Sequence, residues 1–349
     1  MDSLKVMLVC GSDLLESFSI PGFWVPEQSN IKVVDDLVPN QISSTQVRKE
    51  ATQHDLLRDV AISLCSKDDI EKRKRLIADI SGNLFPPWWT NQGQHSICAR
   101  LVSLSTDENF SSNWHDMQLP EVEVLVLNIK SRNYVLPQFM KKMKQLKVLI
   151  ITNDGCSTSE IQGLPILGDL SSLKRICFER VFISSISDSI LKPGNLQKIS
   201  FIMCEISAAF RNCTIQTLDM LPNLSEIVID YCCDLVEFPA FLCESRSLQK
   251  LSITNCHALL TIAEEFGNLE NLEVLRLHAC TKLEELPETI GSLKKLGFLD
   301  ISDCIGISKW PEQMGDLCSL TEIDMRGCRG LSVKDLEKLK KVEKVTCDK

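Results

Sequence analysis

The chain has 349 residues, of which 44% are hydrophobic but only 6% aromatic, so it can bury a sizeable and mostly aliphatic core. Its formal net charge of −9 disfavours nucleic acid as a partner, because phosphates repel an acidic protein. No run approaches the roughly 18 apolar residues of a membrane-spanning helix, so we expect no membrane span. The 16 cysteines follow no signal peptide, and we therefore expect reduced thiols in a cytoplasmic or nuclear protein.

Residues 1–50 contain one candidate strand, Lys5 to Cys10, among loops with proline and asparagine, and they match no domain pattern. Residues 51–90 begin with apolar residues at helical spacing, such as Leu57, Val60 and Leu64. A charged helix is predicted from Asp68 to Ile80, and Ser81-Gly82-Asn83 would end it. Two prolines and two tryptophans then form a predicted linker over residues 86–89.

Residues 91–349 contain an internal repeat. Five segments match the pattern L-x-x-L-x-L-x-x-C, with Ile or Met allowed at the apolar positions, and they start at Leu224, Leu248, Leu272, Leu296 and Leu320, always 24 residues apart. Apolar positions alternate within each unit, which indicates a short strand added to a parallel sheet. The predicted fold class is therefore α/β, a leucine-rich-repeat solenoid with a parallel β-sheet horseshoe, regular over residues 224–331. Weaker units at 196–204, 173–178, 146–151 and 122–127 have irregular spacing and predict a less uniform first half.

Two further features of the repeat can be predicted. Pro287, in the return after a strand, restricts the backbone and favours an irregular or 3₁₀-like turn. One cysteine follows each strand, and we expect these thiols to be buried and to donate weakly to carbonyls of the adjacent turn. The alternative, a metal or redox column, lacks any C-x-x-C pair, and no metal ligand set stands out. The cysteines of this column are residues 204, 232, 256, 280, 304 and 328.

Strand alternation would also leave a strip of mixed charge on the concave face of the sheet. Tyr231 and Phe298 are its candidate anchors for a protein partner, because aromatic residues dominate binding energy at interfaces. The alternative is that these are ordinary solvated sheet positions. No nucleophile motif, zinc-protease motif or paired carboxylates stand out, so we expect no catalytic residues and no enzyme. The predicted protein-binding residues are Tyr231, Lys250, Arg276, His278, Phe298, Asp300 and Arg326.

The segment from Thr52 through Gln53-His54-Asp55 to Ala61, followed by Arg73 to Ile77 and Trp88, resembles the end of an NB-ARC nucleotide-binding module. It is similar to plant helper NLR immune receptors of the CC-R type, the N-requirement-gene group, in which Gln-His-Asp replaces Met-His-Asp. Trp114-x-x-Met117, Tyr134-x-Leu136-Pro137 and the cysteine-centred repeats resemble the leucine-rich region of the same group. The resemblance implies that residues 51–90 end a winged-helix-like NB-ARC remnant, to which residues 1–50 could also belong.

The resemblance also implies a non-catalytic interaction module of plant innate immunity. Its partners would be lipase-like immune heterodimers or full-length helper NLRs, which it would regulate or compete with. In the family, residues like His54 and Asp55 approach ADP and hold the resting state. This chain has no G-x-x-x-x-G-K-[ST] loop, however, so we expect a short form without bound nucleotide. The alternatives are a nucleotide-dependent (ADP/ATP) NLR switch that still signals, and His54-Asp55 as a simple helix cap.

Overall fold

The computed structural model describes residues 74–90, 97–186, 194–213, 221–332 and 342–348. The chain divides into two compact units, Met1–Arg73 and Lys74–Lys349, and all that follows concerns the second. The helices predicted within residues 52–73, the strand predicted at Lys5 to Cys10, and the unassigned residues 1–50 lie outside the described residues.

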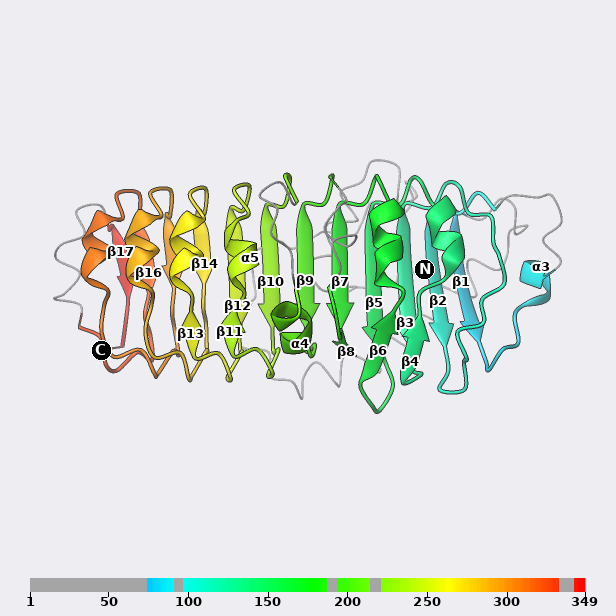
Figure 1. Cartoon of the computed structure of the whole chain (residues 1–349), viewed down its shortest axis with the longest axis horizontal. Coiled ribbons are helices and arrows are strands. Elements are labelled where there is room, and N and C mark those ends of the chain that lie inside the picture. Colours follow the sequence, from blue (N-terminus) through cyan, green and yellow to red (C-terminus); the bar gives the residue numbers. More distant parts are fainter. Residues whose placement is uncertain (1–73, 91–96, 187–193, 214–220, 333–341, 349) are drawn as a thin grey trace, which may run out of the picture. The chain divides into compact units, whose positions relative to one another are not determined.

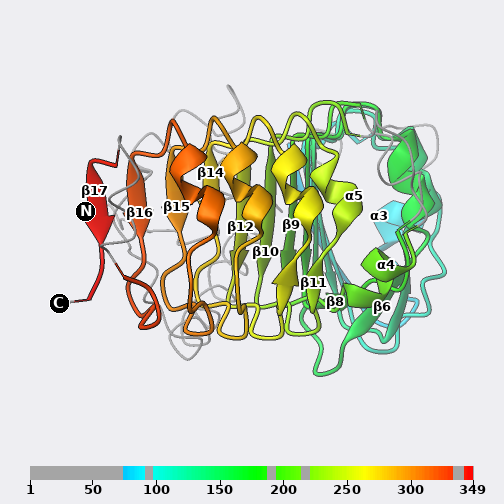
Figure 2. The same cartoon turned by 60° about the vertical axis from the view of Figure 1, so that its left-hand side comes forward.

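The described part of the second unit is built on one parallel sheet of 12 strands that lie side by side in chain order (Figure 1). Neighbouring strands come from successive repeats, and short helices and 3₁₀ turns cover one face of this sheet (Figures 1 and 2). The strands are β1 (Arg75–Ile80), β2 (Leu101–Thr106), β3 (Val124–Ile129), β5 (Val148–Asn153), β7 (Arg175–Glu179), β9 (Lys198–Ile202), β10 (Glu226–Asp230), β12 (Lys250–Thr254), β14 (Val274–Arg276), β15 (Phe298–Asp300), β16 (Glu322–Asp324) and β17 (Lys344–Thr346).

The repeat spacing sets the register of this sheet. Glu226 pairs with Lys250, Lys250 with Val274, and Val274 with Phe298, each 24 positions further along the chain. The apolar residues of each unit, such as Leu251 and Ile253, are fully buried, while the intervening positions face the open side of the sheet. In the first half the pairs Val148↔Arg175 and Glu226↔Lys198 depart from 24. The predicted parallel sheet and its less regular first half are both confirmed.

The start of the sheet corrects two predictions. Residues Arg75–Ile80 are a strand, not the end of a charged helix, and they pair in parallel with β2. Leu76 and Ile80 are four residues apart and fit a helix as well as a strand, but the burial of Ala78 between them gives the two-residue period of a strand. The repeat stack therefore begins by Lys74 rather than at residue 91, and residues 74–80 are not part of a helical segment.

The return segments contain 3₁₀ turns in both halves of the stack, and some of them contain short helices or strands. In the regular repeats they form 3₁₀ turns after Ala263, Pro287 and Pro311, as predicted for Pro287. The remaining returns include two small parallel sheets, of three and two strands. The 3₁₀ turns are η3 (Gln138–Lys142), η4 (Leu164–Asp169), η5 (Glu264–Asn268), η6 (Glu288–Ser292) and η7 (Glu312–Asp316). The short helices are α3 (Pro87–Thr90), α4 (Ser207–Arg211) and α5 (Ala240–Cys243). The three-stranded sheet consists of β4 (Asn133–Val135), β6 (Ser159–Gln162) and β8 (Val181–Phe182), and the two-stranded sheet of β11 (Glu237–Phe238) and β13 (Thr261–Ile262).

The cysteine column has the predicted structural role. All six cysteines are buried, and each thiol donates to a backbone carbonyl of the preceding repeat. The Cys280 sulfur lies 3.4 Å from the Ile253 oxygen, and the Cys328 sulfur lies 2.9 Å from the Ile301 oxygen. The column thus connects the turn of each repeat to the end of the strand segment in the preceding repeat.

An aromatic cluster replaces aliphatic packing near the first strands. The Trp89 and Trp114 rings stack with centroids 6.0 Å apart, and Trp114 also meets Phe110 at 4.7 Å. The Trp114 indole N–H donates to the Val135 oxygen at 3.2 Å, which anchors the cluster to β4. The expectation of a mostly aliphatic core therefore fails locally, because several aromatic residues gather near the first strands.

Candidate functional site

The open face of the sheet, opposite the short helices, carries three rows of side chains at every second strand position. Rows arise because equivalent positions in neighbouring strands pair directly. The second half of this face is the candidate site, and we call it the sheet face. Its rows are Glu226, Lys250, Val274, Phe298 and Glu322; Val228, Ser252, Arg276, Asp300 and Asp324; and, continuing past the shorter strands, Asp230, Thr254, His278, Ser302 and Arg326.

The centre of the sheet face is an ordered cluster on β14 and β15. The Arg276 Nε lies 3.2 Å from the Asp300 Oδ2, and its guanidinium carbon lies 5.6 Å from the centroid of the Phe298 ring. Asp300 is only 8% exposed, so it supports Arg276 rather than meeting solvent. The arginine is thereby held in one orientation beside a half-buried aromatic ring. A fixed cation next to an apolar ring is suited to binding another protein.

Two further hydrogen bonds extend this cluster. Ser302 donates from its hydroxyl to the Asp300 Oδ1 at 2.5 Å, so the hydroxyl oxygen can accept from the His278 Nδ1, 2.8 Å away. Ser302 lies between the carboxylate and the histidine, and it is 3% exposed. A nucleophilic triad needs the histidine between serine and the carboxylate, with an accessible hydroxyl. The arrangement therefore orients side chains and does not activate a nucleophile.

The next strand adds a second ordered cation. Arg326 donates to both carboxylate oxygens of Asp324, with its Nη2 2.6 Å from Oδ2 and its Nε 2.9 Å from Oδ1. Partial burial alone would raise the pKa of Asp324, but these bonds and the charge of Arg326 outweigh it and lower the pKa. The same contact raises the pKa of Arg326. Both groups are therefore charged across the physiological range.

The structure brings some of the predicted residues together and separates others. Arg276, His278, Phe298 and Asp300 form one cluster, and Arg326 lies on the adjacent strand. Lys250 is exposed on β12, on the far side of β14 from Phe298. Tyr231 lies just past the end of β10, at the corner where the chain leaves the sheet.

Sequence reasoning missed Ser302 and Asp324, which hold His278 through one hydrogen bond and Arg326 through another. The repeat spacing could have identified both, because Ser302 lies 24 residues after His278 and Asp324 lies 24 residues after Asp300. Residues His54 and Asp55, which the family resemblance places near a nucleotide, lie outside the described residues.

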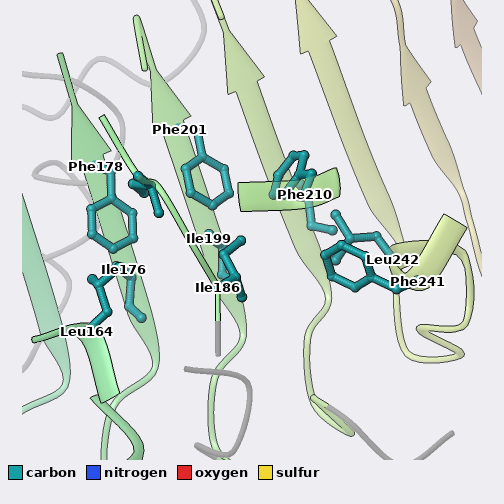
Figure 3. A pocket seen from close by; sticks show the side chains of 11 residues that line it. Leu164, Ile176, Phe178, Ile186, Ile199, Phe201, Phe210, Phe241 and Leu242 are labelled. Atoms are coloured by element: carbon teal, nitrogen blue, oxygen red, sulfur yellow. The ribbon is translucent and has the colours of Figure 1, made fainter. Parts of the chain in front are cut away.

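An apolar cavity lies behind the sheet, within the core of the irregular repeats (Figure 3). Phe178, Phe201 and Ile227 line it from strands, while Phe210 and Leu242 line it from α4 and α5. All its lining side chains are apolar, so it offers burial but no polar group to orient a ligand. We therefore place the candidate site on the sheet face.

Within the described part of the chain, no group of three or more histidine, cysteine or acidic side chains is placed to hold a metal ion. None of the helices in that part is both long and apolar enough to cross a membrane.

Comparison with known proteins gives the following similarities. No family model matches the chain. It is 42% identical over 218 residues to a probable disease resistance protein of Arabidopsis thaliana, covering 62% of this chain and 52% of that protein. It is 37% identical over 219 residues to the Arabidopsis thaliana disease resistance protein ADR1, covering 63% and 28%. It is 44% identical over 201 residues to another probable disease resistance protein of that plant, covering 57% and 24%.

The chain therefore spans about half the length of the first of these relatives and about a quarter of the others. Among solved structures it is similar to the leucine-rich repeat domain of the type III effector XopL, with a TM-score of 0.55 and 20% identity, covering 65% of this chain and 77% of that one. That likeness concerns the fold alone. Together with the stacked parallel strands it confirms a leucine-rich-repeat fold.

Proposed function

We propose that this chain is a protein-recognition module of plant innate immunity, in a disease resistance protein of the NLR type, and that it binds its partner through the sheet face. The single observation that carries the proposal is the ordered cluster of Arg276, Phe298 and Asp300 on the open side of the sheet. Side chains held in one orientation lose little conformational entropy on binding, which favours affinity. Similarity to disease resistance proteins supplies the biological setting.

The finer proposal concerns partners and the direction of the effect. We infer a member of the CC-R-type helper group that acts in the cytoplasm or nucleus without catalysis. Its partners would be lipase-like immune heterodimers or full-length helper NLRs. A module that occupies such a partner without producing an output lowers the free partner concentration by mass action. The chain would then act as a competitor of full-length helper NLRs.

The test is overexpression of the whole chain in plant tissue during helper-NLR-dependent cell death. The parent should reduce cell death, and Arg276→Glu combined with Phe298→Ala should abolish that effect. The first change reverses the charge of the central cation, and the second removes the ring beside it. Lys282→Glu, a charge reversal at an exposed turn residue outside the sheet face, is the matched control and should suppress like the parent.

Circular dichroism must show that the double variant is folded, which we expect because neither change touches the buried leucine and cysteine positions. A folded double variant that suppresses cell death fully would remove the sheet face from the proposal. Cell death triggered by the parent itself would contradict the competitor role.

A further inference from the structure

A row of residues with left-handed backbone runs along one edge of the stack, one residue before each position of the cysteine column. Their φ angles lie between 53° and 77°. The conformation lets each N–H reach the neighbouring repeat: Met203 donates to the Asp230 oxygen at 2.7 Å, and Tyr231 donates to the Thr254 oxygen at 3.0 Å. The backbone requirement is therefore the same in every repeat. The row consists of Met203, Tyr231, Asn255, Ala279, Asp303 and Gly327, and Arg180 has the same conformation one repeat earlier, before Val181.

The residues in this row differ in how well they tolerate a left-handed backbone. Asparagine, aspartate and glycine tolerate left-handed backbone, and three of the later repeats use them: Asn255, Asp303 and Gly327. Met203 and Tyr231 are bulky and disfavour it. Packing does not explain them, because Met203 is 42% exposed and Tyr231 is 36% exposed. Two neighbouring repeats thus hold large apolar side chains in solvent on backbone that disfavours them, a combination that points to a function.

The surroundings of these two side chains are acidic. Arg180 is the cation of this edge, and it already pairs with Asp154 at 2.8 Å and with Glu179 at 3.6 Å. Other carboxylates nearby accept hydrogen bonds from neutral groups: Asp230 from Thr254, Glu205 from Thr158, and Asp234 from the Ser207 N–H. In the described part of the chain these last three carboxylates contact no cationic side chain. Their negative charge is therefore left for a partner to neutralise.

We propose that Met203 and Tyr231 form a docking edge for a partner protein segment in which an apolar side chain is flanked by lysine or arginine. The apolar side chain would lie against the exposed methionine and tyrosine, while the flanking cations would face Glu205, Asp230 and Asp234. The edge rests on the proposed function, since its occupant is a partner of the same recognition module. It nevertheless lies at the ends of β9 and β10, away from the cluster on β14 and β15.

The backbone conformation makes a sharp test possible. Met203→Asn and Tyr231→Asn place at each position the residue that Asn255 already provides in the next repeat, so the double variant should fold with no fall in melting temperature. Ala279→Asn is the matched control, because it makes the same change in the same row without removing a large side chain. The probe is a fluorescein-labelled peptide, Lys-Lys-Leu-Trp-Lys-Lys, and fluorescence anisotropy with the full chain measures its Kd.

We expect the parent and Ala279→Asn to bind the peptide equally, and the Met203→Asn, Tyr231→Asn double variant to bind at least tenfold more weakly. Two comparison peptides, one with glutamates for the lysines and one with alanines for Leu-Trp, should also bind the parent at least tenfold more weakly. Equal binding by the parent and the double variant would overturn the docking edge. A clear fall in melting temperature for the double variant would overturn it as well, because the two side chains would then be packing residues.

The sheet-face variant Arg276→Glu, Phe298→Ala separates this proposal from the proposed function. We expect it to bind the peptide like the parent. If it loses the peptide while the edge variant keeps it, the docking edge is wrong and the sheet face stands. If the edge variant alone loses the peptide while the sheet-face variant still suppresses cell death, the docking edge stands and the sheet face is wrong.

Discussion

The cysteines after each strand act as small buried residues with a weak donor, and this role determines which substitutions the stack accepts. Cys280 is 0% exposed, and its thiol lies 3.4 Å from the Ile253 oxygen. Cys280→Asp would bury a carboxylate without a cation and should cost several kcal/mol, whereas Cys280→Ser keeps a donor and should cost on the order of 1–2 kcal/mol. Urea unfolding measures both changes. Equal and negligible effects would mean that the column is exposed.

Burial of these thiols also makes stability depend on pH. Desolvation raises the pKa of Cys204 from 9.0 to about 12. In the unfolded chain the thiol ionises first as pH rises, so this contribution to stability is complete below pH 9.0 and is lost progressively up to about pH 12. The expected loss is about 1.4 kcal/mol for each pH unit in that window.

The measurement is urea unfolding at pH 8 and at pH 10.5 for the parent and for Cys204→Ala. The parent should lose more stability between the two pH values than the variant, which has no thiol at this position. The difference between the two proteins isolates Cys204 from the lysines and tyrosines that titrate in the same range. Identical losses would show that the Cys204 thiol is not buried in solution.

At the scale of elements, close contact between successive 3₁₀ turns requires glycine. A Cβ at Gly267 in η5 would lie 2.7 Å from the Thr289 Cβ and 2.8 Å from the Thr289 oxygen in η6. Gly267→Ala should therefore push two turns apart and destabilise the protein by about 1–3 kcal/mol. A Cβ at Gly297 would come no closer than 3.7 Å to any atom beyond its two chain neighbours, so Gly297→Ala is the control.

That control should be neutral or stabilising by up to about 1 kcal/mol, because alanine restricts the unfolded chain. Chemical denaturation of the two variants and the parent measures these differences in the free energy of unfolding. If Gly267→Ala is as stable as Gly297→Ala, the turns are not packed as closely as the structure places them.

Some strands of the sheet could be predicted from the sequence and others could not. The regular repeats were predictable because each of them needs the same buried positions, such as Leu251 and Leu275, to pack against its neighbours. The first strand was not, because the apolar positions of Arg75–Ile80 fit both a helix and a strand, and only pairing with β2 decides. Strand β2 was not recognised as a separate unit either, because its unit has Ala99 at the position where the others have leucine or valine.

At the scale of the whole molecule, the sequence located the sheet face but not how its side chains interact. Alternation along each strand places Arg276 and Phe298 on the open face, which is a property of the backbone. Their contact depends on pairing between β14 and β15 and on rotamers, which no single repeat specifies. Tyr231 was predicted to lie in the strip, but left-handed backbone turns the chain away from the sheet there.

Binding of a protein to the sheet face can be measured by quantitative affinity purification from plant tissue. The full chain, the Arg276→Glu, Phe298→Ala double variant and the Lys282→Glu control would be expressed at equal levels, and co-purified proteins would be measured by mass spectrometry. We expect at least one protein that the parent and the control retain equally and that the folded double variant loses at least tenfold. The same set of proteins in the same amounts with all three chains would contradict binding at the sheet face.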